Sequence, residues 1–325
     1  MIKLKRFGIV LLVISFAFLA NTRIFGETIA KDCSRTSVGF LPLIDMGATQ
    51  YYPNDTHPNR VNGGLYGNGI NTLPLEHPHM VNAQVANGQI APRDSAGNPG
   101  VDGKIGFISI GMSNTSSEFS TFKRNIDKSS LKSPKVVIVD GAQPGKTAAR
   151  WVSEERVWTT LSDRVQASGL SKEQVQVAWV KLTNMNPKPD TDAYAVFVNK
   201  LRDDMAYVVK RLKTEYPNSK IAYLSSRIYA GYSLSPQSPE PFAYEGGFSN
   251  RFLIDDQIAG GVITGVTYNN SPVLLWGSYL WADGLSPNSE GLIWECGDFT
   301  DDGVHPSSSG NNKIALKLTS FFTTD

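Results

Sequence analysis

Two short segments, far apart in the chain, carry residue types that could act as a nucleophile and a base. Ser113 follows an apolar run that ends at Ile110, and a hydroxyl at the end of a strand can face a crevice beside the N–H groups of a helix start. Asp302 and His305 lie three residues apart on a turn. A carboxylate this close can bind the imidazole Nδ1–H and leave Nε2 outward as a base. Structurally, an N-cap serine and a surface histidine on a capping loop are the alternatives.

The elements that would position these residues alternate between strand and helix. Short apolar runs rich in β-branched residues cover 104–110, 135–139, 175–182, 220–224 and 273–276. Stretches with helical spacing of apolar residues cover 150–168, 192–216, 245–260 and 307–322. This alternation predicts a three-layer α/β/α sandwich with a central parallel sheet. Ligands bind at the carboxyl ends of such strands, so chemistry is expected after Ile110, Val139, Leu182 and Leu224.

The N-terminal third differs from the rest. Residues 1–26 combine a basic start with a 14-residue apolar run, Phe7–Ala20, which is typical of a cleaved signal peptide and short for a membrane span. An uncleaved anchor is the alternative. Residues 27–103 are crowded with Gly, Pro and Asn, which predicts a loop-rich extension of turns and short strands. We therefore expect a secreted or periplasmic protein without stable membrane insertion after cleavage.

Composition narrows the function classes. The formal net charge is +1, with 41% hydrophobic and 19% charged residues, so neither disorder nor nucleic-acid binding is indicated. His77 and His79 offer too few ligands for a zinc site, and no metal or cofactor is expected. Export would permit a disulfide between Cys33 and Cys296, but from the sequence two buried thiols are equally compatible.

Taken in chain order, these residues resemble the SGNH (GDSL-like) hydrolases. That family has a serine after the first strand, a glycine after the second, an asparagine after the third and Asp-x-x-His before the last helix. Here Ser113, Gly141, Asn184 and the pair Asp302 and His305 match these blocks, and the resemblance covers residues 104–325.

The resemblance implies the SGNH (flavodoxin-like) fold and a role for each matched residue. Ser113 would be the nucleophile and His305 the base, oriented by Asp302. The backbone N–H groups of Ser113 and Gly141 and the amide of Asn184 would form the oxyanion hole.

Two blocks depart from the family pattern. Gly111-Met-Ser113 replaces Gly-Asp-Ser, and Leu182-Thr-Asn184 replaces Gly-x-Asn-Asp. Asn186 is therefore a rival for Asn184, and Asp301 is a weaker rival for Asp302. These changes indicate a divergent bacterial subgroup.

The substrate class follows from export, from the resemblance and from aromatic residues near the last strand. Asn186, Tyr229, Arg251, Trp276 and Trp281 are candidates for lining a sugar-binding crevice, with core packing as the alternative for the aromatics. We predict an esterase acting on an O-acylated, for example acetylated, carbohydrate or another small ester. The alternative is a catalytically silent carbohydrate-binding protein on the same fold. A separation of about 3 Å between His305 Nε2 and Ser113 Oγ would favour the enzyme.

Overall fold

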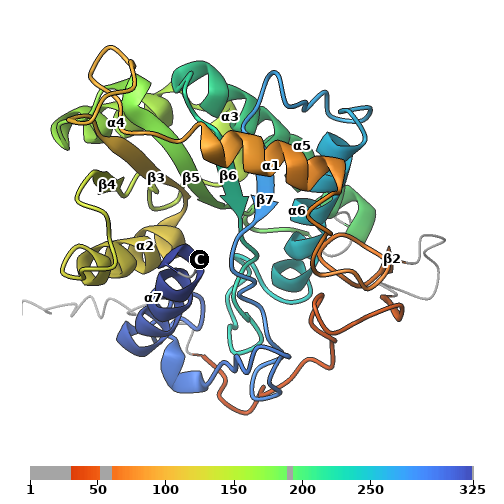
Figure 1. The fold of residues 1–325 in the computed structure, drawn as a ribbon. Helices are drawn as coiled ribbons and strands as arrows, with labels where there is room; N and C mark the ends of the chain where they lie inside the picture. The colour runs from red at the N-terminus through yellow and green to blue at the C-terminus, as the bar shows by residue number, and fades with distance from the viewer. Residues whose placement is uncertain (1–30, 52–60, 189–192, 324–325) are drawn as a thin grey trace, which may run out of the picture.

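The computed structural model describes residues 31–51, 61–188 and 193–323, so the segment predicted to be a signal peptide lies outside it. Its centre is a five-stranded parallel sheet (Figure 1). The strands are β3 (Ile105–Gly111), β4 (Val136–Val139), β5 (Val175–Lys181), β6 (Ile221–Leu224) and β7 (Val273–Trp276). Their spatial order is β4-β3-β5-β6-β7. This is the 2-1-3-4-5 order of flavodoxin-like sheets, whose ligands bind at the switch between the first and third strands.

Helices cover both faces, which confirms the three-layer α/β/α sandwich. Those connecting or following the strands are α2 (Ser113–Ile126), α3 (Ala148–Ser153), α4 (Glu155–Ala167), α5 (Tyr194–Glu215), α6 (Phe242–Ile258) and α7 (Ser308–Thr323). Helices α2 and α7 pack together on one side of the sheet, while α5 packs against α3 and α6 on the other (Figure 1). The sheet is consequently buried on both faces. Its strands read as continuous apolar runs for that reason.

One predicted helix is interrupted. The apolar spacing over 150–168 predicted a single helix, but α3 ends at Ser153 and α4 begins at Glu155, with Glu154 in an extended conformation between them. The Glu154 carboxylate forms ion pairs with both Lys146 and Arg150. The break turns the chain between two separate helices.

The N-terminal extension contains an unexpected helix, α1 (Pro78–Gly88). Its start is capped by the His77 side chain, which accepts from His79 N–H, and Pro78 stands in the first turn, where a missing N–H costs nothing. Its buried face consists of His79, Ala83 and Ala86. Because this face has no large apolar side chain, the helical period was weak in the sequence. The helix packs across β6 and β7.

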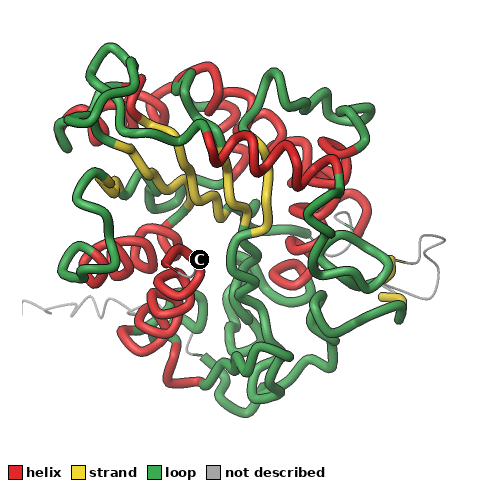
Figure 2. Tube along the Cα trace, in the orientation of Figure 1, coloured by secondary structure: helices red, strands yellow, loops and turns green. Residues whose placement is uncertain are grey.

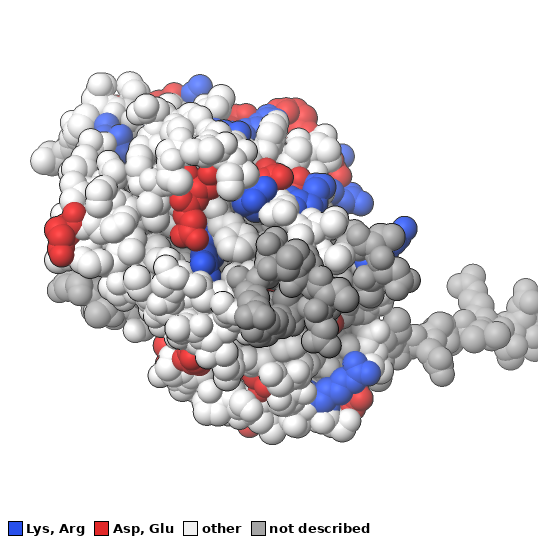
Figure 3. All heavy atoms as spheres, turned by 90° about the vertical axis from the view of Figure 1, so that its right-hand side faces the viewer, with Lys and Arg blue, Asp and Glu red and all other residues white. Residues whose placement is uncertain are grey.

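Elsewhere the extension is mostly loop and lies against the sandwich. Its short strands are β1 (Gln50–Tyr51) and β2 (Val61–Asn62), and two short 3₁₀ helices, η1 (Lys172–Gln174) and η2 (Cys296–Asp298), complete the elements. Loops from the extension and from the segments after β6 and β7 gather beyond the carboxyl ends of the strands (Figure 2). On the face shown in Figure 3, acidic and basic side chains are interspersed between uncharged areas.

Helix α6 buries an acid whose cost to stability can be measured. Glu245 is 2% exposed; its Oε1 accepts from Tyr51 OH at 2.9 Å, and its Oε2 has no hydrogen-bond partner among the described residues. Burial raises the pKa of Glu245 to about 7. A carboxyl whose folded-state pKa is raised binds more protons when folded, so its contribution to stability falls as pH rises from its unfolded value through about 7.

We therefore expect Glu245→Gln to gain stability relative to wild type as pH rises. Between pH 5 and pH 8 the difference in free energy of unfolding should shift by about 2.5 kcal/mol in favour of the variant. Urea unfolding at both pH values measures it. Glu76→Gln, which alters an exposed glutamate, is the control and should show no such shift. An equal pH dependence for wild type and Glu245→Gln would contradict the prediction.

Candidate active site

Ser113 is the first residue of α2, directly beyond the carboxyl end of β3. The turn is tight: a Cβ on Gly111 would lie 2.3 Å from the Thr115 hydroxyl, so only glycine fits there. Thr115 Oγ1 in turn donates to Lys181 O at 2.7 Å, which ties the helix start to β5. No acceptor within the described residues faces the Ser113 backbone N–H. This N–H is one of the unpaired donors at the helix N-terminus, where negative charge is stabilised.

The altered residue of this block, Met112, has become part of the core. It is 5% exposed. Its neighbourhood is organised by Asp140, whose carboxylate accepts from the hydroxyls of Ser109, Ser116 and Ser120 at 2.6–2.9 Å. An acid directly after β4 is thus hydrogen-bonded to two serines in the first turns of α2.

A continuous hydrogen-bonded chain joins the two segments singled out in the sequence. His305 Nε2 lies 2.8 Å from Ser113 Oγ, and His305 Nδ1 lies 2.6 Å from Asp302 Oδ2. The other oxygen, Asp302 Oδ1, accepts from the backbone N–H groups of Val304 and His305 and from the Thr300 hydroxyl. The carboxylate is therefore held in one orientation. Such a chain can move a proton from a serine hydroxyl to an imidazole.

The electrostatics favour an ionised Asp302. Partial burial acts to raise its pKa, but hydrogen bonds from the His305 backbone, the Thr300 hydroxyl, the His305 ring and Val304 outweigh it and hold the pKa of Asp302 well below its usual value. The rival Asp301 contacts the N-terminal extension through its backbone, accepting from Lys31 N–H. The structure brings Asp302, rather than Asp301, to the imidazole.

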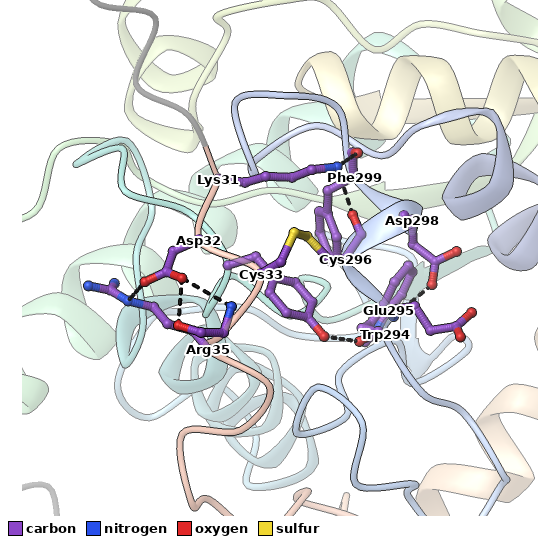
Figure 4. The surroundings of a disulfide bond; sticks show 12 residues. Lys31, Asp32, Cys33, Arg35, Trp294, Glu295, Cys296, Asp298 and Phe299 are labelled. Atoms are coloured by element: carbon purple, nitrogen blue, oxygen red, sulfur yellow. Dashed lines mark hydrogen bonds and ion pairs between the residues drawn. A yellow bond between two sulfur atoms is a disulfide. The ribbon is translucent and has the colours of Figure 1, made fainter.

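The segment 296–299, which precedes Asp302 and His305 in the chain, is attached to the N-terminal extension (Figure 4). Cys33 and Cys296 form a disulfide, with Cα atoms 5.4 Å apart. Beside it, Lys31 Nζ donates to the backbone carbonyls of Cys296 at 2.8 Å and Phe299 at 2.6 Å. The disulfide left open by the sequence is therefore present, and it lies nine residues before His305 in the chain.

The expected oxyanion donor Gly141 requires a correction. Its N–H donates to Ser109 Oγ at 3.1 Å, and the residue is buried and does not line the cavity that contains Ser113. Gly145 lines the cavity with Ser113 instead. It occupies a turn with φ +72°, which favours glycine, and its N–H has no acceptor among the described residues. The sequence suggested Gly141 because it comes first after the strand, but the following turn brings a later glycine to the site.

The two asparagines lie beside this cavity rather than in it. Asn184 Nδ2 donates to Asp204 Oδ2 at 2.8 Å and its Oδ1 accepts from Ala149 N–H, so the amide is oriented by these two contacts. Both Asn184 and Asn186 line an adjoining cavity of about 610 Å³, which shares Gly145 with the first. A role for Asn184 in binding an oxyanion stays a prediction.

The remaining substrate-binding candidates are corrected to framework positions. Tyr229 and Trp281 are fully buried and donate to Arg35 O and Glu240 Oε1. Trp276 donates to Leu65 O. Arg251 forms an ion pair with Asp255 and donates to Asn62 O. None of the four lines the cavity beside Ser113, because they attach the N-terminal extension or fill the core, as the alternative interpretation of the aromatics held.

The cavity beside Ser113 has a volume of about 180 Å³. It is lined by Met112, Ser113, Asn114, Pro144, Gly145, Met185, Arg227, Gln237, Ser238, Val304 and His305. Three of these residues, Arg227, Gln237 and Ser238, were not predicted from the sequence. Arg227 could have been found, because it follows Leu224, the end of a predicted strand, by three residues. Gln237 and Ser238 stand in an irregular segment without such a signal.

His79 of the extension has a structural role. His79 Nδ1 lies 2.8 Å from Tyr268 OH and Nε2 lies 2.9 Å from Leu274 O, and burial lowers the pKa of His79 to about 4. Both ring nitrogens are therefore engaged within the fold.

In the part of the chain that the structure describes, no group of three or more His, Cys, Asp or Glu residues is arranged for a metal ion. No helix in this part is both long and apolar enough to span a membrane.

Comparison with known proteins gives only distant likenesses. No family model and no curated protein matches the sequence. A solved structure described as a GDSL-like lipase from Parabacteroides merdae aligns at 11% identity over 72% of this chain and 99% of its own, with a TM-score of 0.38. A catalytic mutant of an acetylxylan esterase from Geobacillus stearothermophilus aligns at 14% identity over 68% and 95%, also with a TM-score of 0.38. The periplasmic domain of a lipopolysaccharide acetyltransferase from Salmonella aligns at 13% identity over 75% and 89%, with a TM-score of 0.39.

Proposed function

We propose that this protein is a serine hydrolase. The observation that carries the proposal is the chain of contacts from Asp302 through His305 to Ser113, at 2.6 and 2.8 Å. Those are the separations that nucleophile, base and orienting acid need for proton transfer. The chain lies at the carboxyl end of a parallel sheet, where ligands of such folds bind. The rival function, a silent carbohydrate-binding protein, has no need of this alignment.

The bond attacked is, we infer, an ester. Ser113 Oγ adds to the acyl carbon while His305 Nε2 takes its proton, and the backbone N–H groups of Ser113 and Gly145 donate to the oxyanion. His305 then returns the proton to the departing alcohol, which leaves an acyl group on Ser113. Water, deprotonated by the same imidazole, releases the acid and restores the hydroxyl. Removing one donor from such an oxyanion site typically costs about 3 kcal/mol in the transition state.

The natural substrate is proposed to be an O-acylated carbohydrate outside the cytoplasm. The Cys33–Cys296 disulfide supports an oxidising compartment, in agreement with the signal peptide predicted over residues 1–26. A cavity of about 180 Å³ is smaller than the pockets of about 300–1,000 Å³ that enclose drug-sized ligands. This size suits a short acyl group such as acetyl.

The test is a series of p-nitrophenyl esters of increasing acyl length. We expect the acetate to be hydrolysed with the highest kcat/KM, and the octanoate at least about tenfold more slowly, because each methylene without room forfeits roughly 1 kcal/mol or more. Release of acetate from acetylated xylan, with deacetylated xylan as the blank, tests the carbohydrate part. A preference for octanoate would contradict the short acyl group. Absence of turnover on every ester would contradict the hydrolase.

A further inference from the structure

Arg227 is a buried cation with no direct partner among the residues that the structure describes. It is 5% exposed and follows the carboxyl end of β6. Within the described residues its Nε has no hydrogen-bond partner, and no hydrogen bond or ion pair joins its side chain to another residue. A buried guanidinium is normally paired, because removing its charge from water is costly. A buried guanidinium that lacks a protein partner and lines a cavity therefore indicates that a bound ligand supplies the partner.

The nearest acids are already engaged. Both Glu118 and Glu240 interact with the charge of Arg227. However, both oxygens of Glu118 accept from Lys181 Nζ, at 2.5 and 2.6 Å. Glu240 accepts from Trp281 Nε1 and from the backbone N–H groups of Ala230 and Tyr244. Burial also raises the pKa of Glu240 to about 7, which weakens its negative charge at neutral pH. Positive charge therefore remains in excess around Arg227.

A second buried polar group without a partner lines the same cavity. Ser238 is 3% exposed, and no group in the described residues forms a hydrogen bond with its Oγ. Arg227 and Ser238 line this cavity together with Ser113 and His305. A cation and a hydroxyl from two residues that line one small cavity offer donors for an oxyanion. A carboxylate suits them best, because its two oxygens match the planar fork of a guanidinium.

We propose that the cavity beside Ser113 binds a carboxylate of the ester substrate, with Arg227 as its counter-ion and Ser238 as a further donor. The substrate class is then an acylated acid, such as an O-acetylated uronic acid residue or an ester with a second carboxylate in its acyl part. This inference rests on the proposed function for its reaction. Its binding step does not need that function.

The experiment compares neutral and anionic esters of matched shape. One pair is methyl O-acetylglucoside and methyl O-acetylglucuronoside, in which the carboxylate is on the alcohol. The other is p-nitrophenyl butyrate and mono-p-nitrophenyl succinate, in which it is on the acyl group. Wild type should prefer the anionic member of one pair by about tenfold or more in kcat/KM. The pair that shows the preference identifies which side of the ester carries the carboxylate.

Arg227→Gln should reduce that preference, the ratio of kcat/KM for the anionic and neutral members, by about tenfold to a hundredfold. Arg227→Lys should retain part of the preference. The matched control, Arg150→Gln, removes an exposed cation that lines only the adjoining cavity and should leave the preference intact. A purely structural role for Arg227 would lower turnover of neutral and anionic esters alike, and that result would overturn the proposal.

Calorimetric binding of methyl glucuronoside, methyl glucoside and succinate to wild type separates the two proposals and does not depend on a variant folding. If no ester is turned over but an anionic probe binds and methyl glucoside does not, the carboxylate site stands and the hydrolase fails. If p-nitrophenyl acetate is turned over but neither pair shows a preference and neither anionic probe binds, the hydrolase stands and the carboxylate site is overturned.

Discussion

Replacing Ser113 by alanine should lower kcat/KM for p-nitrophenyl acetate by about a thousandfold or more, at equal folded concentration. The hydroxyl is the only group at this position that can form the acyl intermediate, and its proton acceptor, His305 Nε2, lies 2.8 Å away. Because the three residues act in series, losing the nucleophile removes most of what the other two contribute. Residual activity would come from the backbone donors alone.

The matched control is Ser117→Ala in the same helix. Ser117 Oγ donates to Asn114 O at 3.0 Å and does not line the cavity, so its loss should change turnover by less than about threefold. Thermal unfolding of both variants beside wild type checks that they are folded. If Ser113→Ala and wild type hydrolyse the ester at the same rate, the activity has another origin and the proposed mechanism fails.

Removing the disulfide should produce the largest loss of stability. The Cys33–Cys296 bond joins residues separated by 263 positions. Closing a loop of this length in the unfolded chain corresponds to about 5 kcal/mol on the chain-entropy model. We expect the double variant Cys33→Ser/Cys296→Ser to lose up to about this amount in denaturant unfolding. A thiol count on denatured, unreduced wild type should find no free thiol.

The same variant should also lose activity, because the bond attaches the loop that carries His305. Lys31, two residues before Cys33, donates to carbonyls of that loop, and the disulfide holds the two segments together (Figure 4). Ser34→Ala, in the same segment, is the control; its hydroxyl contacts only the nearby Asp32. A double variant within about 1 kcal/mol of wild type, with full turnover, would show that the disulfide is dispensable.

The sequence by itself determined the sheet, because each buried strand is a short apolar run and each covering helix repeats its apolar residues at helical spacing. It also determined the local chemistry. Asp302 and His305 are three residues apart on one turn, where they contact each other. Ser113 follows β3, which the apolar run 104–110 predicts. Interactions of this kind depend on neighbours in the chain and are therefore visible in it.

Tertiary structure decided what depends on segments far apart. Cys33 and Cys296 form a disulfide only because the folded chain brings the N-terminal extension next to the segment around residue 296. The turn after β4 brings Gly145 rather than Gly141 to the cavity. Trp276 and Trp281 have the composition of a sugar-binding surface, yet packing of the extension buries them. The sequence shows that Arg227 is charged. Only the structure shows that it is buried without a partner among the described residues, because the nearby acids bind other groups. Burial and pairing are properties of the assembled fold, because they depend on every element that packs around a residue.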